Sequence, residues 1–257
     1  PHIAHLALRN IYNHPIVDEI IFLDDGSDPK MLSELTAYLS RFRSKVTLYR
    51  RNQNEGVLLT KYQAVSLCKN DHVLLLDSDN TVLPSYLNAL VQMQKLRKDC
   101  IYAPDFGKPH YDFSEWKGKC FDYRTITSFI SAKPQIRAFI NTGNYVVPRD
   151  EFIASTKWLM NDNGLLPRVD ACDVAVANLA WCQNGGKIHV LSNAAYRHRV
   201  HDGSVFRERR NDITEFRETF FRQWETGDHF KIQKYYSIIK DKRVQSINCE
   251  VSKVEWK

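Results

Sequence analysis

The first 80 residues alternate between apolar runs and polar turns, with the periods expected of strands and helices. Short apolar runs predict strands at Glu19–Leu23, Lys45–Tyr49 and Val73–Leu76, the last of them buried on both faces as in a parallel sheet. Apolar positions at helical spacing predict helices within residues 1–14, 29–42 and 57–69. Because strands and helices alternate and crossovers are right-handed, the pattern predicts a doubly wound α/β fold with a mostly parallel central sheet.

The rest of the chain continues the alternation less regularly. Further strands are expected at Cys100–Ala103, Tyr145–Val147 and Lys187–Leu191, and further helices from Pro84, Arg149 and Asp173. Residues 104–135 read as a long irregular insertion rich in aromatic side chains, which is typical of a functional loop or lid. Helical patterns near 213–224 and 230–239 complete the prediction. We therefore expect one domain, 1–204, with a helical C-terminal extension, 205–257, packed on it.

Two of the predicted strands run directly into carboxylates. Val73–Leu76 is followed by Asp77-Ser78-Asp79, and Glu19–Leu23 by Asp24-Asp25-Gly26-Ser27. Ligands of open α/β sheets bind beyond the carboxyl ends of the strands, where these acids could hold a metal or a sugar. Clustered carboxylates repel one another, and a divalent cation is the simplest group to offset that repulsion. A helix cap or a solvated turn is the alternative for an isolated Asp-x-Asp.

Composition narrows the functional classes. The chain has 257 residues, 43% apolar and 26% charged, and no apolar run approaches the roughly 18 residues of a membrane span, so no transmembrane segment is expected. The net charge is +6, but basic residues are scattered among acidic ones, which argues against a nucleic-acid partner.

Six cysteines without a C-x-x-C pair read as free thiols, so we expect a reducing, cytoplasmic location. The absence of an initial methionine and of a signal-peptide pattern predicts that the sequence is part of a larger chain.

The segment around Asp77 also matches a different pattern. Leu76-Asp77-Ser78-Asp79-Asn80-Thr81 fits the hydrophobic-D-x-D-x-T opening of haloacid-dehalogenase-like phosphatases, in which Asp77 would be the phosphoryl nucleophile and Asp79 the general acid. That family usually opens with this strand, whereas two strands precede it here. Its later acidic pair is also incomplete, because Ile232 stands where the second Asp after Gly227-Asp228 should be. We keep the phosphatase as the alternative.

Taken in chain order, five features resemble a family 2 glycosyltransferase of the GT-A fold. They are Glu19 to Ser27, Asn54-Glu55-Gly56 with Lys61, Leu76 to Asp79, Asp173 a helix before Gly185-Gly186, and Tyr196 to Ser204. They cover residues 19–204. The resemblance implies a Rossmann-like domain and a metal-dependent, inverting hexosyltransferase. It would move a sugar from a nucleoside-diphosphate sugar, a UDP-sugar above all, to a hydroxyl of a carbohydrate or glycoconjugate acceptor.

The resemblance also implies roles for individual residues. Asp24, Asp25, Gly26 and Ser27 would contact the base or ribose, Lys61 the base or diphosphate, and Asp77 with Ser78 the ribose. Asp79 would bind Mn²⁺ or Mg²⁺, with His201 completing the site and His198 as its alternate. Asp173 would be the general base, with Asp170 in reserve. The family often has adjacent Glu-Asp at this point, whereas Ala171-Cys172 separates the two acids here, and two helix-capping acids remain the alternative reading.

Three departures from the family pattern qualify these expectations. The family normally begins with a short strand that carries nucleotide contacts, and this chain starts in the helix that follows it, so that strand is missing or trimmed. Lys61 stands where Arg is common. The Q-x-x-R-W motif of processive members is absent, since Phe221-Arg222-Gln223-Trp224 has the wrong order, which predicts single sugar addition.

The aromatic insertion would shape the acceptor side of the binding site. A third reading is a non-catalytic GT-A-like module that binds a partner through residues 106–123.

Overall fold

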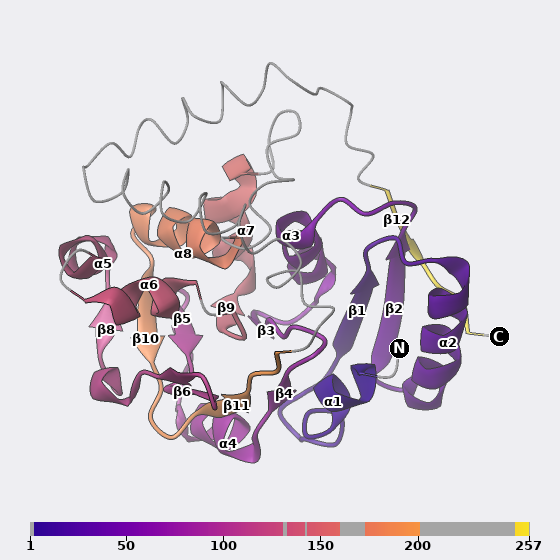
Figure 1. Ribbon diagram of the computed structural model, residues 1–257, viewed down its shortest axis with the longest axis horizontal. Coiled ribbons are helices and arrows are strands. Elements are labelled where there is room, and N and C mark those ends of the chain that lie inside the picture. The colour runs from indigo at the N-terminus through magenta and orange to yellow at the C-terminus, as the bar shows by residue number, and fades with distance from the viewer. Residues whose placement is uncertain (1–2, 131–132, 142, 160–172, 201–249, 257) are drawn as a thin grey trace.

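The structure is a computed structural model that describes residues 3–130, 133–141, 143–159, 173–200 and 250–256. It contains strands in three sheets, covered by helices on their outer faces (Figure 1). In the view of Figure 1, the sheet nearest both chain ends lies on the right with α2 outside it. The largest sheet lies on the left, beneath α7 and α8.

Eight α-helices are described. Their bounds are α1 Ala4–Leu8, α2 Pro29–Leu39, α3 Val57–Leu67, α4 Pro84–Gln92, α5 Tyr123–Ile130, α6 Pro134–Ile140, α7 Arg149–Thr156 and α8 Asp173–Gln183. The helices predicted from Pro29, Val57, Pro84 and Arg149 are thereby confirmed. Local signals explain that success. At α2, for example, the Asp28 carboxylate accepts hydrogen bonds from the backbone N–H groups of Lys30 and Met31, and Pro29 occupies the first turn.

The described strands form sheets of three, five and four members. The first sheet has the order β1-β2-β12, with bounds Ile20–Asp24, Val46–Arg51 and Val251–Lys253. The second has the order β3-β9-β5-β10-β8, with bounds His72–Leu74, Val146–Pro148, Cys100–Ala103, Lys187–Val190 and Cys120–Phe121. The third has the order β4-β11-β6-β7, with bounds Thr81–Val82, Ala195–Arg197, Phe106–Lys108 and Tyr111–Asp112.

Antiparallel pairs outnumber parallel pairs among the described strands. β1 pairs in parallel with β2, β5 with β10, and β6 with β11, whereas β9 runs antiparallel to both of its neighbours, β3 and β5. The central sheet is therefore mixed, not mostly parallel as expected, because β9 and β8 pair antiparallel with their neighbours. With the flanking helices, the sheets still form the predicted α/β architecture.

The apolar run Val73–Leu76 differs from its prediction. It was expected to be buried on both faces, but all four residues are only half-buried and the strand β3 ends at Leu74. The reason is the position of β3, which lies at the edge of its sheet with β9 as its one neighbour among the described strands. One side of this apolar segment therefore faces the interior of a cleft.

The prediction for residues 104–135 was wrong in part. The segment contains β6, β7, β8 and helix α5. Three of its aromatic residues, Phe113, Trp116 and Phe121, are 2% exposed and pack against Phe139 of α6. They belong to the core beneath α8 and do not form a lid. Tyr111 is the member of the group that reaches the cleft described below.

The two ends of the chain also depart from the expected pattern. The N-terminal helix α1 spans only Ala4–Leu8. At the other end, β12 pairs antiparallel with β2, where a helical extension was expected, and the helices predicted near 213–224 and 230–239 lie outside the described residues.

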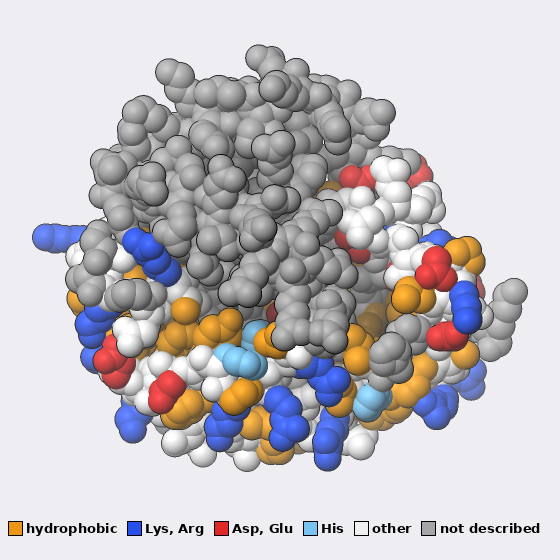
Figure 2. All heavy atoms as spheres, viewed as in Figure 1, with side chains coloured by type: hydrophobic (Ala, Val, Ile, Leu, Met, Phe, Trp, Pro, Cys, Tyr) orange, Lys and Arg blue, Asp and Glu red, His pale blue; other side chains and the backbone are white. Residues whose placement is uncertain are grey.

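Among the described residues, no helix is both long and apolar enough to cross a bilayer. On the face shown in Figure 2, basic side chains spread along the lower rim between apolar and uncharged ones.

Candidate active site

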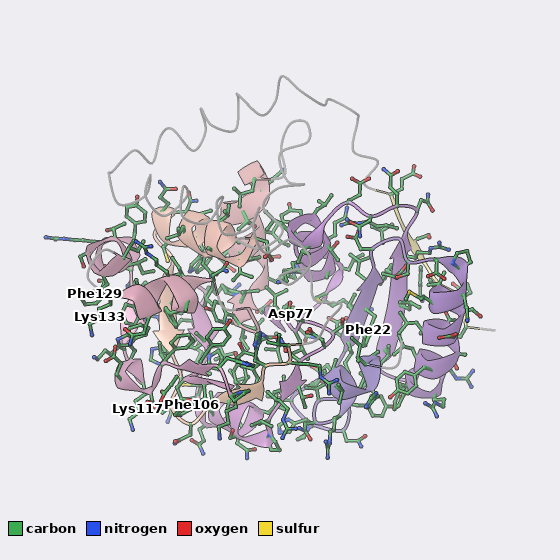
Figure 3. The ribbon with its side chains drawn as sticks, in the orientation of Figure 1. Phe22, Asp77, Phe106, Lys117, Phe129 and Lys133 are labelled. Carbon is green, nitrogen blue, oxygen red and sulfur yellow. The ribbon has the colours of Figure 1, made fainter. Side chains whose placement is uncertain are left out.

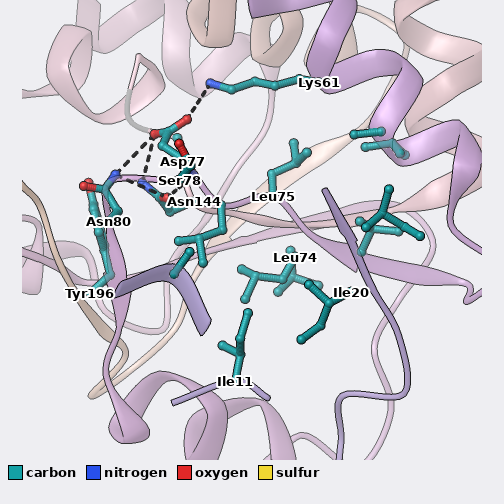
Figure 4. Close-up of a pocket in the computed structure, with 18 of the residues that line it drawn as sticks. Ile11, Ile20, Lys61, Leu74, Leu75, Asp77, Ser78, Asn80, Asn144 and Tyr196 are labelled. Atoms are coloured by element: carbon teal, nitrogen blue, oxygen red, sulfur yellow. Dashed lines mark hydrogen bonds and ion pairs between the residues drawn. The ribbon is translucent and has the colours of Figure 1, made fainter. Parts of the chain in front are cut away.

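A deep cleft of about 1830 Å³ opens between the first and second sheets. Figure 4 shows its two contrasting ends. Ile20, Leu74 and Leu75 mark an apolar end, while Lys61, Asp77 and Asn144 gather at a polar end. In Figure 3, Asp77 lies at the centre of the molecule, to the left of Phe22 on β1. The polar end is the candidate active site.

Lys61 joins two carboxylates at this end of the cleft. Its ammonium lies 3.1 Å from Oδ1 of Asp77 and 3.0 Å from Oδ2 of Asp173. Lys61 comes from the second turn of α3, Asp77 follows β3, and Asp173 is the first residue of α8. Three elements that are far apart in the sequence therefore meet at one cation, which makes this the polar centre of the cleft.

Burial and charge act in opposite directions on this centre. Burial raises the pKa of Asp173, which is 6% exposed, and Lys61 opposes that rise through its charge and its hydrogen bond. Burial alone would lower the pKa of Lys61, but the two carboxylates reverse the sign and hold its pKa above the usual range. Asp173 thus combines a raised pKa with a cationic partner, which suits a group that exchanges a proton with a substrate.

Asn144 and Asn80 fix the position of Asp77. Oδ1 of Asn144 accepts a hydrogen bond from the backbone N–H of Asp77 at 3.0 Å, and Nδ2 of Asn80 donates to Oδ2 of Asp77 at 3.3 Å. Asn144 is 2% exposed and has a φ of 68°, in the left-handed region that asparagine tolerates. The backbone carbonyl of Asn144 accepts a hydrogen bond from the Tyr86 hydroxyl at 2.9 Å. Sequence reasoning missed both asparagines as site residues.

The segment between α6 and β9 connects Asp77 to the start of α8. Asn141 accepts a hydrogen bond from the backbone N–H of Ala175 in the first turn of α8, at 3.3 Å. Gly143 passes so close to the ion pair that a Cβ there would lie 3.3 Å from Oδ2 of Asp77 and 3.7 Å from Nζ of Lys61. The run Asn141-Thr142-Gly143-Asn144 was the available signal, because Asn and Gly directly before a strand mark a specialised turn.

The Asp24-Asp25-Gly26-Ser27 turn has a clear structural role. The carboxylate of Asp25 accepts hydrogen bonds from the backbone N–H groups of Glu55 and Gly56, and it forms an ion pair with Nη1 of Arg51. All three N···O distances are 3.0–3.1 Å. Gly26 has a φ of 78°, and a Cβ there would meet the backbone carbon of Gln53 at 2.5 Å, so only glycine fits. The turn therefore ties β1 to the start of α3, the helix that carries Lys61.

We predict that Arg51→Met destabilises the protein by about 3 kcal/mol, because it removes the cationic partner of a largely buried carboxylate. The side chains of Arg51 and Asp25 are 1% and 18% exposed. Urea unfolding measures the change. Arg97→Met is the matched control, since Arg97 and its partner Asp99 are 59% and 43% exposed, and its loss should leave the free energy of unfolding nearly unchanged. Equal effects of the two substitutions would contradict the assignment.

The predicted site residues fall into three groups by their position relative to the cleft. Asp25, Lys61, Asp77, Ser78, Asp79, Asp173 and His198 all line the cleft. Asp24, Gly26 and Ser27 are not among its lining residues, and their contact with a donor stays a prediction. Asp170 and His201 lie outside the described residues, so their roles as reserve base and metal ligand also stay predictions.

Asp79 and His198 are the described residues that could take part in metal binding. No group of three or more His, Cys, Asp or Glu side chains suited to a metal ion occurs among the residues the structure describes. Mg²⁺ and similar cations need fewer, because they bind one or two carboxylates and fill their other positions with phosphate and water oxygens. Nδ1 of His198 is buried without a hydrogen-bond partner, and burial lowers the pKa of this imidazole, which favours the neutral form that binds metals. The residues present therefore fit such an ion.

Comparison with known proteins decides the family. The sequence profile described as Glycosyl transferase family 2 matches residues 5–153, more than half of the chain. The chain belongs to glycosyltransferase family 2. The predicted resemblance is thereby confirmed, and the phosphatase alternative loses its support. No curated protein sequence matches the chain.

Solved structures agree on the GT-A fold of this glycosyltransferase. TarS 1–349 from S. aureus in complex with UDP-GlcNAc matches with a TM-score of 0.56 and 16% identity, over 78% of this chain and 56% of that one. The mannosyltransferase PcManGT from Pyrobaculum calidifontis, in complex with GDP-Man and Mn²⁺, has a TM-score of 0.56 and 12% identity, over 90% and 61%. GalNAc-T7 with UDP, GalNAc and Mn²⁺ has values of 0.51 and 14%, over 77% and 41%. The glycosyltransferase chain thus spans about half the length of these structures.

Proposed function

We propose that this glycosyltransferase transfers one sugar from a nucleoside-diphosphate sugar to an acceptor hydroxyl with inversion, and that Asp173 is the general base. The observation that carries the proposal is the placement of Asp173. Its buried carboxylate opens into the same cleft as Asp77, Ser78 and Asp79 and is held by Lys61. UDP and GDP nucleotides occupy the related structures named above, which supports a nucleotide donor, and we favour a UDP-sugar.

The proposed reaction follows from the chemistry of these groups. The Asp173 carboxylate accepts the proton of the acceptor hydroxyl, whose oxygen attacks the anomeric carbon as the bond to the diphosphate breaks. The electron pair of that bond leaves with the nucleoside diphosphate. Direct displacement places the new bond on the opposite face of the sugar, which gives inversion.

The donor is proposed to bind along the polar end of the cleft. Asp77, held by Asn80 and Asn144, accepts hydrogen bonds from the ribose, with the exposed Ser78 beside it. Lys61 brings positive charge next to the diphosphate. Asp79, with His198 or His201, would hold a Mn²⁺ or Mg²⁺ ion, whose chemistry is to stabilise negative charge on the leaving group as a Lewis acid. Mn²⁺ in two of the related structures supports this choice.

A thermal-shift screen tests the donor class. UDP, GDP, dTDP and CDP are each added with and without Mn²⁺, and the expected result is a rise in Tm for one of them, UDP by our proposal, that needs the metal. A ligand that binds only the folded state stabilises it by RT ln(1 + [L]/Kd), or about 2.7 kcal/mol at 100 times Kd. No shift with any nucleotide would favour the non-catalytic module instead.

We predict that Lys61→Met shifts the acid limb of the pH profile of kcat/KM to higher pH. Lys61 lowers the pKa of Asp173, so its removal lets burial raise that pKa further and leaves less of the carboxylate ionised at a given pH. At neutral pH the activity should fall by at least about tenfold and recover partly in alkaline buffer. Lys61→Arg is the control, because it keeps the charge and should keep the limb in place. An unchanged limb in Lys61→Met would contradict the role of Asp173.

A further inference from the structure

Two basic side chains lie next to each other on the third sheet. Lys108 of β6 and Arg197 of β11 are partners in the parallel register of these strands, so their side chains lie on the same face of the sheet. Both are exposed, and in the described part of the chain no carboxylate forms an ion pair with either. Because like charges at paired positions repel, the fold holds these two cations together at a cost in stability.

The pair leads into the polar end of the cleft. The backbone N–H of His198 donates to the carbonyl oxygen of Lys108 at 2.8 Å. The next residue, Arg199, donates its backbone N–H to Oδ1 of Asn80 at 3.0 Å, and Asn80 in turn holds Asp77. Arg199 is exposed and lines the cleft. Positive charge therefore continues from the sheet to the candidate active site. Figure 2 shows Lys and Arg side chains at the lower centre of this face, where Figure 1 places β6 and β11.

Aromatic rings lie beside these cations. Nζ of Lys108 is 5.7 Å from the ring centroid of Phe106, two residues earlier on the same face of β6. His110 packs edge to face on His198 with 5.1 Å between ring centroids, and the Tyr111 centroid is 5.0 Å from that of His198. His110 and Tyr111 both line the cleft. A flat ring next to a cation offers two contacts together, one with the apolar face of a sugar and one with a charge on its rim.

One acid lies on the described strands of this sheet. Asp112 of β7 is the partner of Phe106, on the opposite side of β6 from Arg197. Its carboxylate accepts a hydrogen bond from the backbone N–H of Ser114 at 2.9 Å, and it forms no ion pair with the cations. Positive charge therefore dominates a basic strip, which consists of Phe106, Lys108, His110, Arg197 and Arg199.

We propose that the basic strip binds the acceptor of the transferase, and that this acceptor is a glycan whose sugars carry carboxylates. The inference rests on the proposed transfer to an acceptor hydroxyl. In a uronic acid the carboxylate is attached to the sugar ring, so a ring stacked on the aromatic side chains places its charge beside the cations. A chain of phosphodiesters without rings would pair with the cations but leave the aromatic faces unused.

The test measures binding of fluorescently labelled hexagalacturonate to the full chain by anisotropy, without sugar nucleotide. We expect saturable binding that weakens at least about tenfold when NaCl is raised from about 0.05 M to about 0.5 M, because salt screens exposed charges. The matched control ligand is the methyl ester of the same hexamer, which keeps the sugar rings and loses the charges. It should bind at least about tenfold more weakly than the acid.

Substitutions in the protein provide the second arm. The double variant Lys108→Gln/Arg197→Gln should weaken binding of hexagalacturonate roughly tenfold, because it removes two cations from the strip. Its Tm should stay the same or rise slightly, because the repulsion between the two side chains is lost. The matched control is Lys30→Gln/Arg43→Gln. It removes the same two residue types from exposed positions on α2 and beyond its end, which do not line the cleft, and should bind as wild type does.

Four outcomes would overturn the proposal. The first is no binding of hexagalacturonate, and the second is equal binding of the methyl ester, which would show that charge has no part. The third is equal weakening in the control double variant, which would show an effect of net charge alone. The fourth is binding of phosphatidylserine vesicles in place of the glycan, lost in Lys108→Gln/Arg197→Gln, which would assign the strip to a membrane surface.

The nucleotide thermal-shift screen is scored separately from these arms. A shift with UDP and Mn²⁺ but no binding of hexagalacturonate would reject the acidic acceptor and leave the transferase proposal intact. Binding of hexagalacturonate without a shift for any nucleotide would reject the transferase proposal and leave the strip as a glycan-binding surface.

Discussion

Asp173→Asn should lower kcat by about a hundredfold to ten-thousandfold while leaving the affinity for the nucleotide nearly unchanged. The range is that of general acid–base catalysis, and the amide keeps the shape of the side chain but cannot accept the proton. Asp173 is buried and held at 3.0 Å by Lys61, so its carboxylate has a fixed position from which to act. Steady-state transfer assays measure kcat, and titration calorimetry with the nucleoside diphosphate measures binding.

A matched control for this substitution comes from another helix. Asp150 also lies in the first turn of its helix, α7, but its side chain is 65% exposed and it does not line the cleft. Asp150→Asn should therefore retain full activity. If Asp173→Asn retained activity within about tenfold of wild type, the carboxylate would be a helix-capping and ion-pairing group, and the base would have to be sought elsewhere.

Asp79→Ala should reduce metal-dependent binding of the nucleoside diphosphate by at least about a hundredfold. Asp79 lines the cleft two residues beyond Asp77, and a hard carboxylate oxygen is the ligand that Mn²⁺ or Mg²⁺ requires between protein and phosphate. Calorimetric titration of the nucleotide, with Mn²⁺ and then with chelator, separates the metal-dependent part from the rest.

The control for Asp79→Ala removes a carboxylate from a different surface. Glu34 is exposed on α2 and does not line the cleft, so Glu34→Ala should bind nucleotide and metal as wild type does. Wild-type affinity in Asp79→Ala, still lost on chelation, would move the metal ligand to another residue. His201 would then be the first to substitute.

The sequence predicted those parts of the fold that depend on local signals. A cap and a proline specify the start of α2, and apolar runs that end in acids specify β1 and β3. It did not predict that β9 would lie between β3 and β5 and run antiparallel to both. That order depends on pairing between segments about 70 and 40 residues apart, for which a single sequence carries no local pattern.

The candidate site was predicted to a similar degree. The residues with distinctive chemistry and motif spacing, Lys61, Asp77 and Asp173, do meet in the structure. Asn80 and Asn144 were missed because a lone asparagine is usually a turn residue, and only the fold shows that these two hold Asp77. Asp25 lines the cleft, but the sequence could not show that its oxygens already bind Arg51 and the start of α3.

The ammonium of Lys61 has a consequence for how the protein is handled and stored. Two carboxylates that face one cleft would normally demand an external counterion before the chain could fold around them. Here the counterion is part of the chain, because one lysine contacts both. Folding of the chain and binding of the proposed cation are therefore expected to be separate events, so protein treated with chelator should keep its native fold and regain nucleotide binding when metal is returned.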